Sequence, residues 1–302
     1  MAEIIDFAEI QEARRKARAR VPERENLERA VQLMRENLAA VAVEMAAAPH
    51  DHQAELLTRV EQLAAMIRYG MRMLGEPADA LDRGRMTADE GLTLRIIGVE
   101  PGDEIAGARK VTIATTRGAI PLILHSAPDK GRAVLCVSGA IGGFNGPSML
   151  YPRLGLEMPP RGVTIARLDY RAPNEFGECL LDAMAALSFL GGIGNNRLAL
   201  IGHSFGGAVA INAGTLSPIV NTVIALSSQL AGAHVVGELA PKPLLLIHGE
   251  ADMILSHESS QALYDRAGEP KTLKLLPGVG HGLAEASDEV LELVSDWLMQ
   301  KV

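Results

Sequence analysis

Three polar side chains that lie far apart in the sequence are of the types that together make an alcohol nucleophilic. Ser204 is the centre of GHSFG, Asp252 ends HGEAD, and His281 lies in GVGHG. A serine hydroxyl is barely ionised at neutral pH and needs a base within hydrogen-bond reach, and a carboxylate can orient that base. The order Ser204, Asp252, His281 therefore predicts a catalytic triad. Glu250 is the alternative acid.

Acyl transfer also needs hydrogen-bond donors for the negatively charged oxygen of the tetrahedral intermediate. The backbone N–H of Phe205, directly after the serine, is one expected donor. The second is expected from the segment SGAIGG, through the backbone N–H of Ala140 or of Ile141, because glycines let this loop turn inward. The predicted reaction is hydrolysis of a carboxylic ester or thioester through an acyl-enzyme on Ser204.

The substrate pocket is expected to be open. Only 229–242 separates the apolar runs 222–227 and 243–248, and a segment this short cannot form a covering cap of several helices. Four apolar side chains close to the loops named above are expected to line the pocket: Phe144, Met149, Met253 and Ile254. His203 and His248 are expected to have structural roles, as are Asp169 and Arg171.

Short apolar runs alternate with helical segments in the C-terminal two thirds of the chain. This alternation is typical of strands buried on both faces and predicts a doubly wound, mostly parallel sheet. Ligands bind at the carboxyl ends of the strands in such sheets, where the three loops would meet. Strands are predicted at 111–115, 120–124, 133–138, 163–168, 198–202, 222–227, 243–248 and 272–276, and helices at 147–155, 176–190, 206–216, 256–268 and 285–300.

The first part of the chain has a different pattern. Residues 1–85 carry apolar stripes at helical spacing from Leu27 to Met45 and from Leu56 to Leu74, which predict an antiparallel helical hairpin. Three roles are open for this hairpin: a structural appendage, a homodimerisation element, or a lid over the active site. Residues 86–108 are expected to form a linker and a lead-in strand, and 109–302 the catalytic domain.

The composition argues against some classes of binding partner and some cellular locations for this protein. The chain has 302 residues, 48% of them hydrophobic, and a net charge of −8, so it lacks the basic surface of a nucleic-acid-binding protein. No apolar stretch reaches the length of a membrane span. The acidic N-terminus does not fit a signal peptide, which favours a cytoplasmic location. Cys136 and Cys179 are expected to be small buried hydrophobes.

Residues 109–302 resemble an α/β-hydrolase, through GHSFGG, HGEAD, GVGHG and SGAIGG in the family's positions. The resemblance implies an eight-stranded sheet, a Ser–acid–His triad, and neither metal nor organic cofactor. Capless members such as dienelactone-hydrolase-like and acyl-peptidase-like enzymes are similar, although many members have His-Gly where this chain has Ser138-Gly139. A peptidase, acyltransferase or cofactor-free perhydrolase on the same triad is the alternative, and a non-catalytic helical scaffold is another.

Overall fold

The computed structural model describes residues 94–302 and, before them, 27–34, 36–37, 63, 66, 67, 70 and 74. The chain divides into two compact units, Met1–Thr87 and Ala88–Val302. Among the residues described, no helix is long and apolar enough to cross a membrane.

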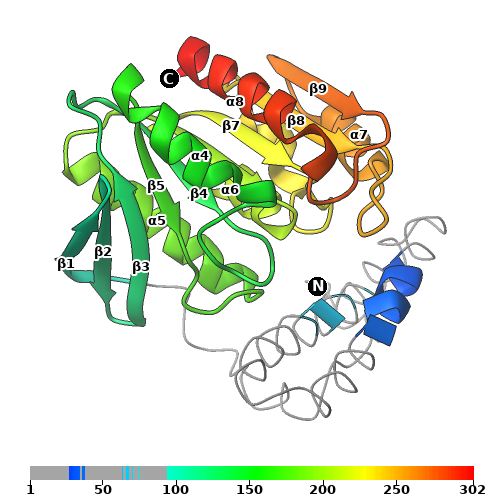
Figure 1. Ribbon diagram of the computed structural model, residues 1–302, viewed down its shortest axis with the longest axis horizontal. Helices are drawn as coiled ribbons and strands as arrows, with labels where there is room; N and C mark the ends of the chain where they lie inside the picture. Colours follow the sequence, from blue (N-terminus) through cyan, green and yellow to red (C-terminus); the bar gives the residue numbers. More distant parts are fainter. Residues whose placement is uncertain are drawn as a thin grey trace, which may run out of the picture. The chain divides into compact units, whose positions relative to one another are not determined.

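A single large sheet forms the centre of the second unit (Figure 1). Its strands are β1 (Ile96–Ile105), β2 (Ala108–Thr115), β3 (Gly118–His125), β4 (Arg132–Val137), β5 (Thr164–Leu168), β6 (Arg197–His203), β7 (Val220–Leu226), β8 (Leu244–Gly249) and β9 (Lys271–Leu276). Their order across the sheet is β1-β2-β3-β5-β4-β6-β7-β8-β9. The pairs among β4 to β9 are parallel, whereas β1, β2 and β3 pair antiparallel. The predicted mostly parallel sheet is confirmed.

The expected number of eight strands is wrong by one, because the sheet of the described residues has nine. The additional strand is β1, which pairs with β2 at the edge of the sheet. Its sequence IIGVEPGDEI contains two glycines, a proline and three acids, and nearly all of its side chains are exposed. The apolar runs that predict buried strands are therefore absent from it, and only the broad expectation of a lead-in strand within 86–108 covers it.

Helices cover both faces of the sheet. They are α4 (Leu150–Glu157), α5 (Phe176–Gly192), α6 (Phe205–Leu216), α7 (Glu258–Arg266) and α8 (Ser287–Lys301), with short 3-10 turns η2 (Pro147–Met149), η3 (Pro159–Arg161), η4 (His234–Leu239) and η5 (Ala284–Ala286). Helices α4 and α8 lie over one face, and α5 and α6 lie over the other (Figure 1). This is the doubly wound arrangement that the sequence predicts.

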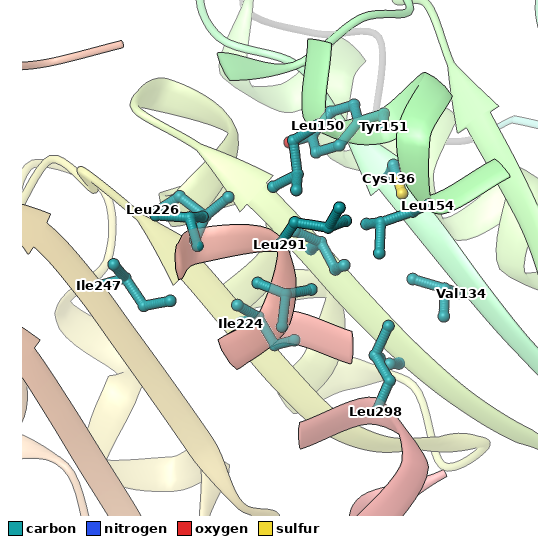
Figure 2. Packing of buried hydrophobic residues seen from close by; sticks show 14 of the residues in the cluster. Val134, Cys136, Leu150, Tyr151, Leu154, Ile224, Leu226, Ile247, Leu291 and Leu298 are labelled. Carbon is teal, nitrogen blue, oxygen red and sulfur yellow. The ribbon is translucent and has the colours of Figure 1, made fainter. Parts of the chain in front are cut away.

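The core under α4 and α8 shows why these elements are fixed in place. Alternate residues of β4, Val134 and Cys136, point into it and meet Leu154 of α4 and Leu291 and Leu298 of α8 (Figure 2). Each buried leucine stabilises the fold by roughly 1.5–3 kcal/mol. The loops that leave the strands therefore start from a rigid layer.

Both cysteines lie in this unit and behave as expected. Cys136 and Cys179 are unpaired and buried. Burial raises the pKa of both thiols above the usual value. They are therefore small apolar side chains in the core.

In the first unit, the described residues before position 75 are helical. Val31 and Met34, two positions of the first predicted stripe, are buried. A Cβ atom added to Gly70 would lie 2.3 Å from Cγ2 of Val31, so the two helical segments are in contact there. Most other positions of the two stripes lie outside the described residues. The appendage, dimerisation and lid roles stay predictions.

Candidate active site

Ser204 occupies a sharp turn between β6 and α6. Its backbone has φ 57° and ψ −118°, a conformation that costs free energy in a residue with a side chain. Two glycines make the turn possible, because a Cβ on Gly202 would lie 2.0 Å from the carbonyl oxygen of Gly206, and one on Gly206 would lie 2.2 Å from that of Ser138. The N–H of Ser204 donates to the carbonyl oxygen of Leu226 at 2.8 Å, which ties the turn to β7.

The loop after β4 runs beside this serine. A Cβ on Gly139 would lie 3.6 Å from Cβ of Ser204. The N–H of Gly142 donates to the carbonyl oxygen of Gly139 at 3.0 Å, so Ala140 and Ile141 are the central residues of a turn. The N–H groups of these two residues make no hydrogen bond to another described residue. That one of them donates to a ligand beside Ser204 stays a prediction.

Asp169, directly after the neighbouring strand β5, holds this loop. Its Oδ1 accepts a hydrogen bond from the N–H of Gly143 at 2.6 Å. The hydroxyl of Ser138 also donates to the carbonyl oxygen of Gly143. The structural role expected for Asp169 is thus the fixing of the loop that carries Ala140 and Ile141.

Asp252 and His281 form a direct pair. The distance from Nδ1 of His281 to Oδ2 of Asp252 is 2.7 Å. The other carboxylate oxygen, Oδ1, accepts the backbone N–H groups of Ile254 at 2.8 Å and Leu255 at 2.9 Å. The alternative acid Glu250 has an exposed side chain. Asp252 is therefore the residue that orients His281.

The charge of Asp252 is stabilised by its surroundings. Burial raises the pKa of this carboxyl group, but hydrogen bonds from His248 and His281 outweigh that effect and hold the pKa well below its usual value. Asp252 is therefore ionised at neutral pH, as a partner of an imidazolium must be.

A close backbone contact explains how residues 29 positions apart in the sequence meet. A Cβ on Gly249 would lie 2.1 Å from the carbonyl oxygen of Val279. The N–H of Ala251 donates to the same oxygen at 3.0 Å. The end of β8 and the histidine loop after β9 are thus held together by the main chain.

His203, directly before Ser204, lies against His281. The two ring centroids are 4.8 Å apart, and Nε2 of His203 lies 3.0 Å from the carbonyl oxygen of His281. Burial, and next the charge of His281, lower the pKa of His203 to about 3, so it stays neutral. This contact places the histidine loop beside the serine turn and gives His203 the structural role that the sequence predicts.

Among the hydrogen bonds of the described residues, none joins Ser204 to His281. Such bonds are often long without substrate and tighten when it binds.

His248 is the residue of this site whose contact the sequence analysis missed. Its side chain is completely buried, and its Nε2 lies 3.1 Å from Oδ2 of Asp252. The sequence predicts only a packing or turn role for it. The available signal was a histidine next to the last residue of the apolar strand β8, four positions before the acid.

The expected pocket residues lie on loops at the carboxyl ends of the strands. Met149 and Met253 are exposed, and Phe144 and Ile254 are partly buried. The hydroxyl of Ser148 donates to the carbonyl oxygen of Gly282 at 2.7 Å, which ties the loop before α4 to the histidine loop. A common pocket formed by these side chains stays a prediction.

Comparison with known proteins identifies the fold. A dienelactone hydrolase from Anabaena variabilis is 18% identical, with a TM-score of 0.56 over 65% of this chain and 99% of that one. An alpha-beta serine hydrolase homologue from Coxiella burnetii is 16% identical, with a TM-score of 0.56 over 65% of this chain and all of that one (100%). These likenesses show that the second unit has the α/β-hydrolase fold. The fold that the resemblance in the sequence implies is thus confirmed.

Two sequence matches accompany this structural likeness. Residues 231–288, which include Asp252 and His281, match the family described as serine aminopeptidase, S33. The uncharacterized protein YfhR from Escherichia coli K12 is 29% identical over 157 residues, which cover 41% of this chain and 55% of YfhR. The chain therefore spans about half the length of that relative.

Proposed function

We propose that the protein is a serine hydrolase that cleaves carboxylic ester or thioester bonds through an acyl-enzyme on Ser204. The observation that carries the proposal is the 2.7 Å hydrogen bond between His281 and the ionised Asp252, in a loop that His203 holds beside the serine turn. A neutral serine, an imidazole and a buried carboxylate are the groups that acyl transfer to water needs.

In the proposed mechanism, Oγ of Ser204 attacks the carbonyl carbon while its proton moves to Nε2 of His281. The negative oxygen of the tetrahedral intermediate accepts hydrogen bonds from the N–H of Phe205 and from that of Ala140 or Ile141. The intermediate collapses when His281 gives its proton to the leaving alcohol or thiol. Water then repeats the sequence on the acyl-enzyme, with His281 again as base, and releases the acid. Asp252 stabilises the imidazolium in both halves.

Exposed apolar side chains favour an acyl group of some length. Ile141, Met149 and Met253 project from the loops beside Ser204 and offer contact to an alkyl chain without enclosing it. The α/β-hydrolase neighbours include esterases, which agrees with an ester substrate.

A peptidase is the second candidate function. It is favoured by the match of residues 231–288 to the serine aminopeptidase family. The same triad would then expel an amine from an N-terminal peptide bond, and His281 would protonate that amine.

Labelling with a fluorophosphonate probe tests the triad. We expect the wild type to be labelled, and the Ser204→Ala variant to lose the label and the turnover of p-nitrophenyl esters while its fold is unchanged. Labelling that persists in the variant, or a wild type that is not labelled, would reject the proposal. Rates with p-nitrophenyl esters, acyl-CoA thioesters and aminoacyl p-nitroanilides separate esterase, thioesterase and aminopeptidase.

A further inference from the structure

His248 connects Asp252, the acid of the proposed triad, to helix α7. Its Nε2 lies 3.1 Å from Oδ2 of Asp252 and 3.0 Å from the carbonyl oxygen of Leu255. Both atoms only accept hydrogen bonds, so Nε2 carries a proton. On the other side of the ring, Nδ1 lies 2.7 Å from Oγ of Ser260 in α7, which fixes the orientation of the ring.

Every acceptor position of Asp252 is thereby used. Oδ2 accepts one N–H from His248 and one from His281, and Oδ1 accepts the two backbone N–H groups. A donor on Oδ2 disperses the negative charge of that oxygen. His248 therefore acts on the same atom that binds His281.

We propose that His248 is a positioning residue for the proposed hydrolysis: it holds the carboxylate of Asp252 in the orientation that His281 requires and limits how strongly Oδ2 binds the imidazolium. This inference rests on the proposed function. Without the donor at position 248, Oδ2 would carry more charge and bind the imidazolium form of the catalytic histidine more strongly. The acid limb of the pH profile would then move upward.

A shift of the acid limb can be assigned to His248 only if the other charged or titratable groups around His281 are unchanged. They are Asp252, His203 at 4.8 Å between ring centroids, and Glu285, whose carboxylate accepts the N–H of Gly280 at 3.1 Å. A substitution at position 248 leaves all three in place. A shift of the acid limb therefore reports the contact between His248 and Asp252.

Two amide variants form a matched pair for the test. In His248→Gln the amide nitrogen replaces Nε2 and can donate to Asp252, whereas in His248→Asn it replaces Nδ1 and reaches only toward Ser260. We expect His248→Asn to move the acid limb of kcat/KM upward by about one pH unit and to lower kcat roughly tenfold. We expect His248→Gln to keep the wild-type limb. Equal limbs in the two variants would overturn the proposal, because a purely structural role cannot distinguish them.

A measurement on the wild type tests the same contact if either variant does not fold. In ¹⁵N-histidine NMR spectra, we expect His248 to carry its proton on Nε2 throughout the pH range of activity. A proton on Nδ1 alone would overturn the proposal, since Asp252 would then have no donor from this ring. A wild type without turnover that depends on Ser204 would reject the proposed function and this role together, whereas an active wild type whose limb is unchanged in His248→Asn would reject this role alone.

Discussion

Replacing Asp252 by asparagine should separate activity from stability. The carboxylate accepts four N–H donors, two on each oxygen, and an amide has only one oxygen. The backbone N–H groups of Ile254 and Leu255 cannot become acceptors, but an imidazole can move its proton to its other nitrogen. We therefore expect the amide oxygen to face the backbone and its NH2 group to face the two histidines, with His281 in the tautomer that cannot accept a proton from Ser204.

The expected losses of activity and of stability follow from this rearrangement of hydrogen bonds. With the wrong tautomer, kcat for p-nitrophenyl acetate should fall by about 10,000-fold, the size of this effect in the Ser-His-Asp template. The free energy of unfolding in urea should fall by only about 1–3 kcal/mol, because the tautomers restore most of the hydrogen bonds. Glu250→Gln is the matched control and should keep wild-type activity, since that side chain is exposed. A folded Asp252→Asn protein within tenfold of wild-type kcat would refute the reasoning.

We also expect the difference in unfolding free energy between the wild type and Asp252→Asn to depend on pH. The pKa of Asp252 is lower in the folded state than in the unfolded chain, so its charge stabilises the fold above the unfolded value of about 3.9. This contribution is lost as the pH falls through the folded pKa. The difference in unfolding free energy between wild type and Asp252→Asn should be constant from about pH 7 to 5 and shrink below about pH 4. A difference that is unchanged at pH 3 would contradict this assignment.

Three further predictions concern the scaffold and the rim of the site, which is formed by the exposed side chains of Ile141, Met149 and Met253. Gly202→Ala should lower the unfolding free energy by about 3 kcal/mol or more and abolish activity, whereas Gly192→Ala, which has open space around it, should do neither. Arg171→Met should lower the free energy of unfolding in urea by about 3–5 kcal/mol, because it removes the charged group at 2.5 Å from Oδ1 of the fully buried Asp182 and leaves that carboxylate with the backbone N–H of residue 171; a loss below 1 kcal/mol would contradict this. Met253→Ser should lower kcat/KM for octanoyl relative to acetyl esters about tenfold, whereas Leu216→Ala at the far end of α6 should leave the ratio unchanged, and equal ratios in both would contradict the rim assignment.

The sequence predicts the buried part of this fold well because burial leaves a pattern. The run predicted as a strand at 243–248 is β8 at Leu244–Gly249, and the helix predicted at 176–190 is α5 at Phe176–Gly192. The exposed strand β1 has no such pattern and depends on pairing with β2, which the sequence does not encode locally.

At the site, the sequence predicts which residues share an edge of the sheet but not how their side chains turn. It places Asp252 after a strand and His281 after the next, and the structure joins them. The contact from His248 to Asp252 escaped prediction. It depends on the loop 249–252 folding back so that the carboxylate reaches the buried end of β8, and only the three-dimensional path of that loop determines it.

Three glycines explain why side chains so distant in the sequence can share one site. Added Cβ atoms at Gly202, Gly206 and Gly249 would each lie between 2.0 and 2.2 Å from a backbone carbonyl oxygen. These contacts join the serine turn to itself and to the loop after β4, and the acid loop to the histidine loop. Because they are made by the main chain, they fix the backbone whatever side chains line the rim. The rim residues can therefore vary with the substrate while the positions of Ser204 and His281 stay constant.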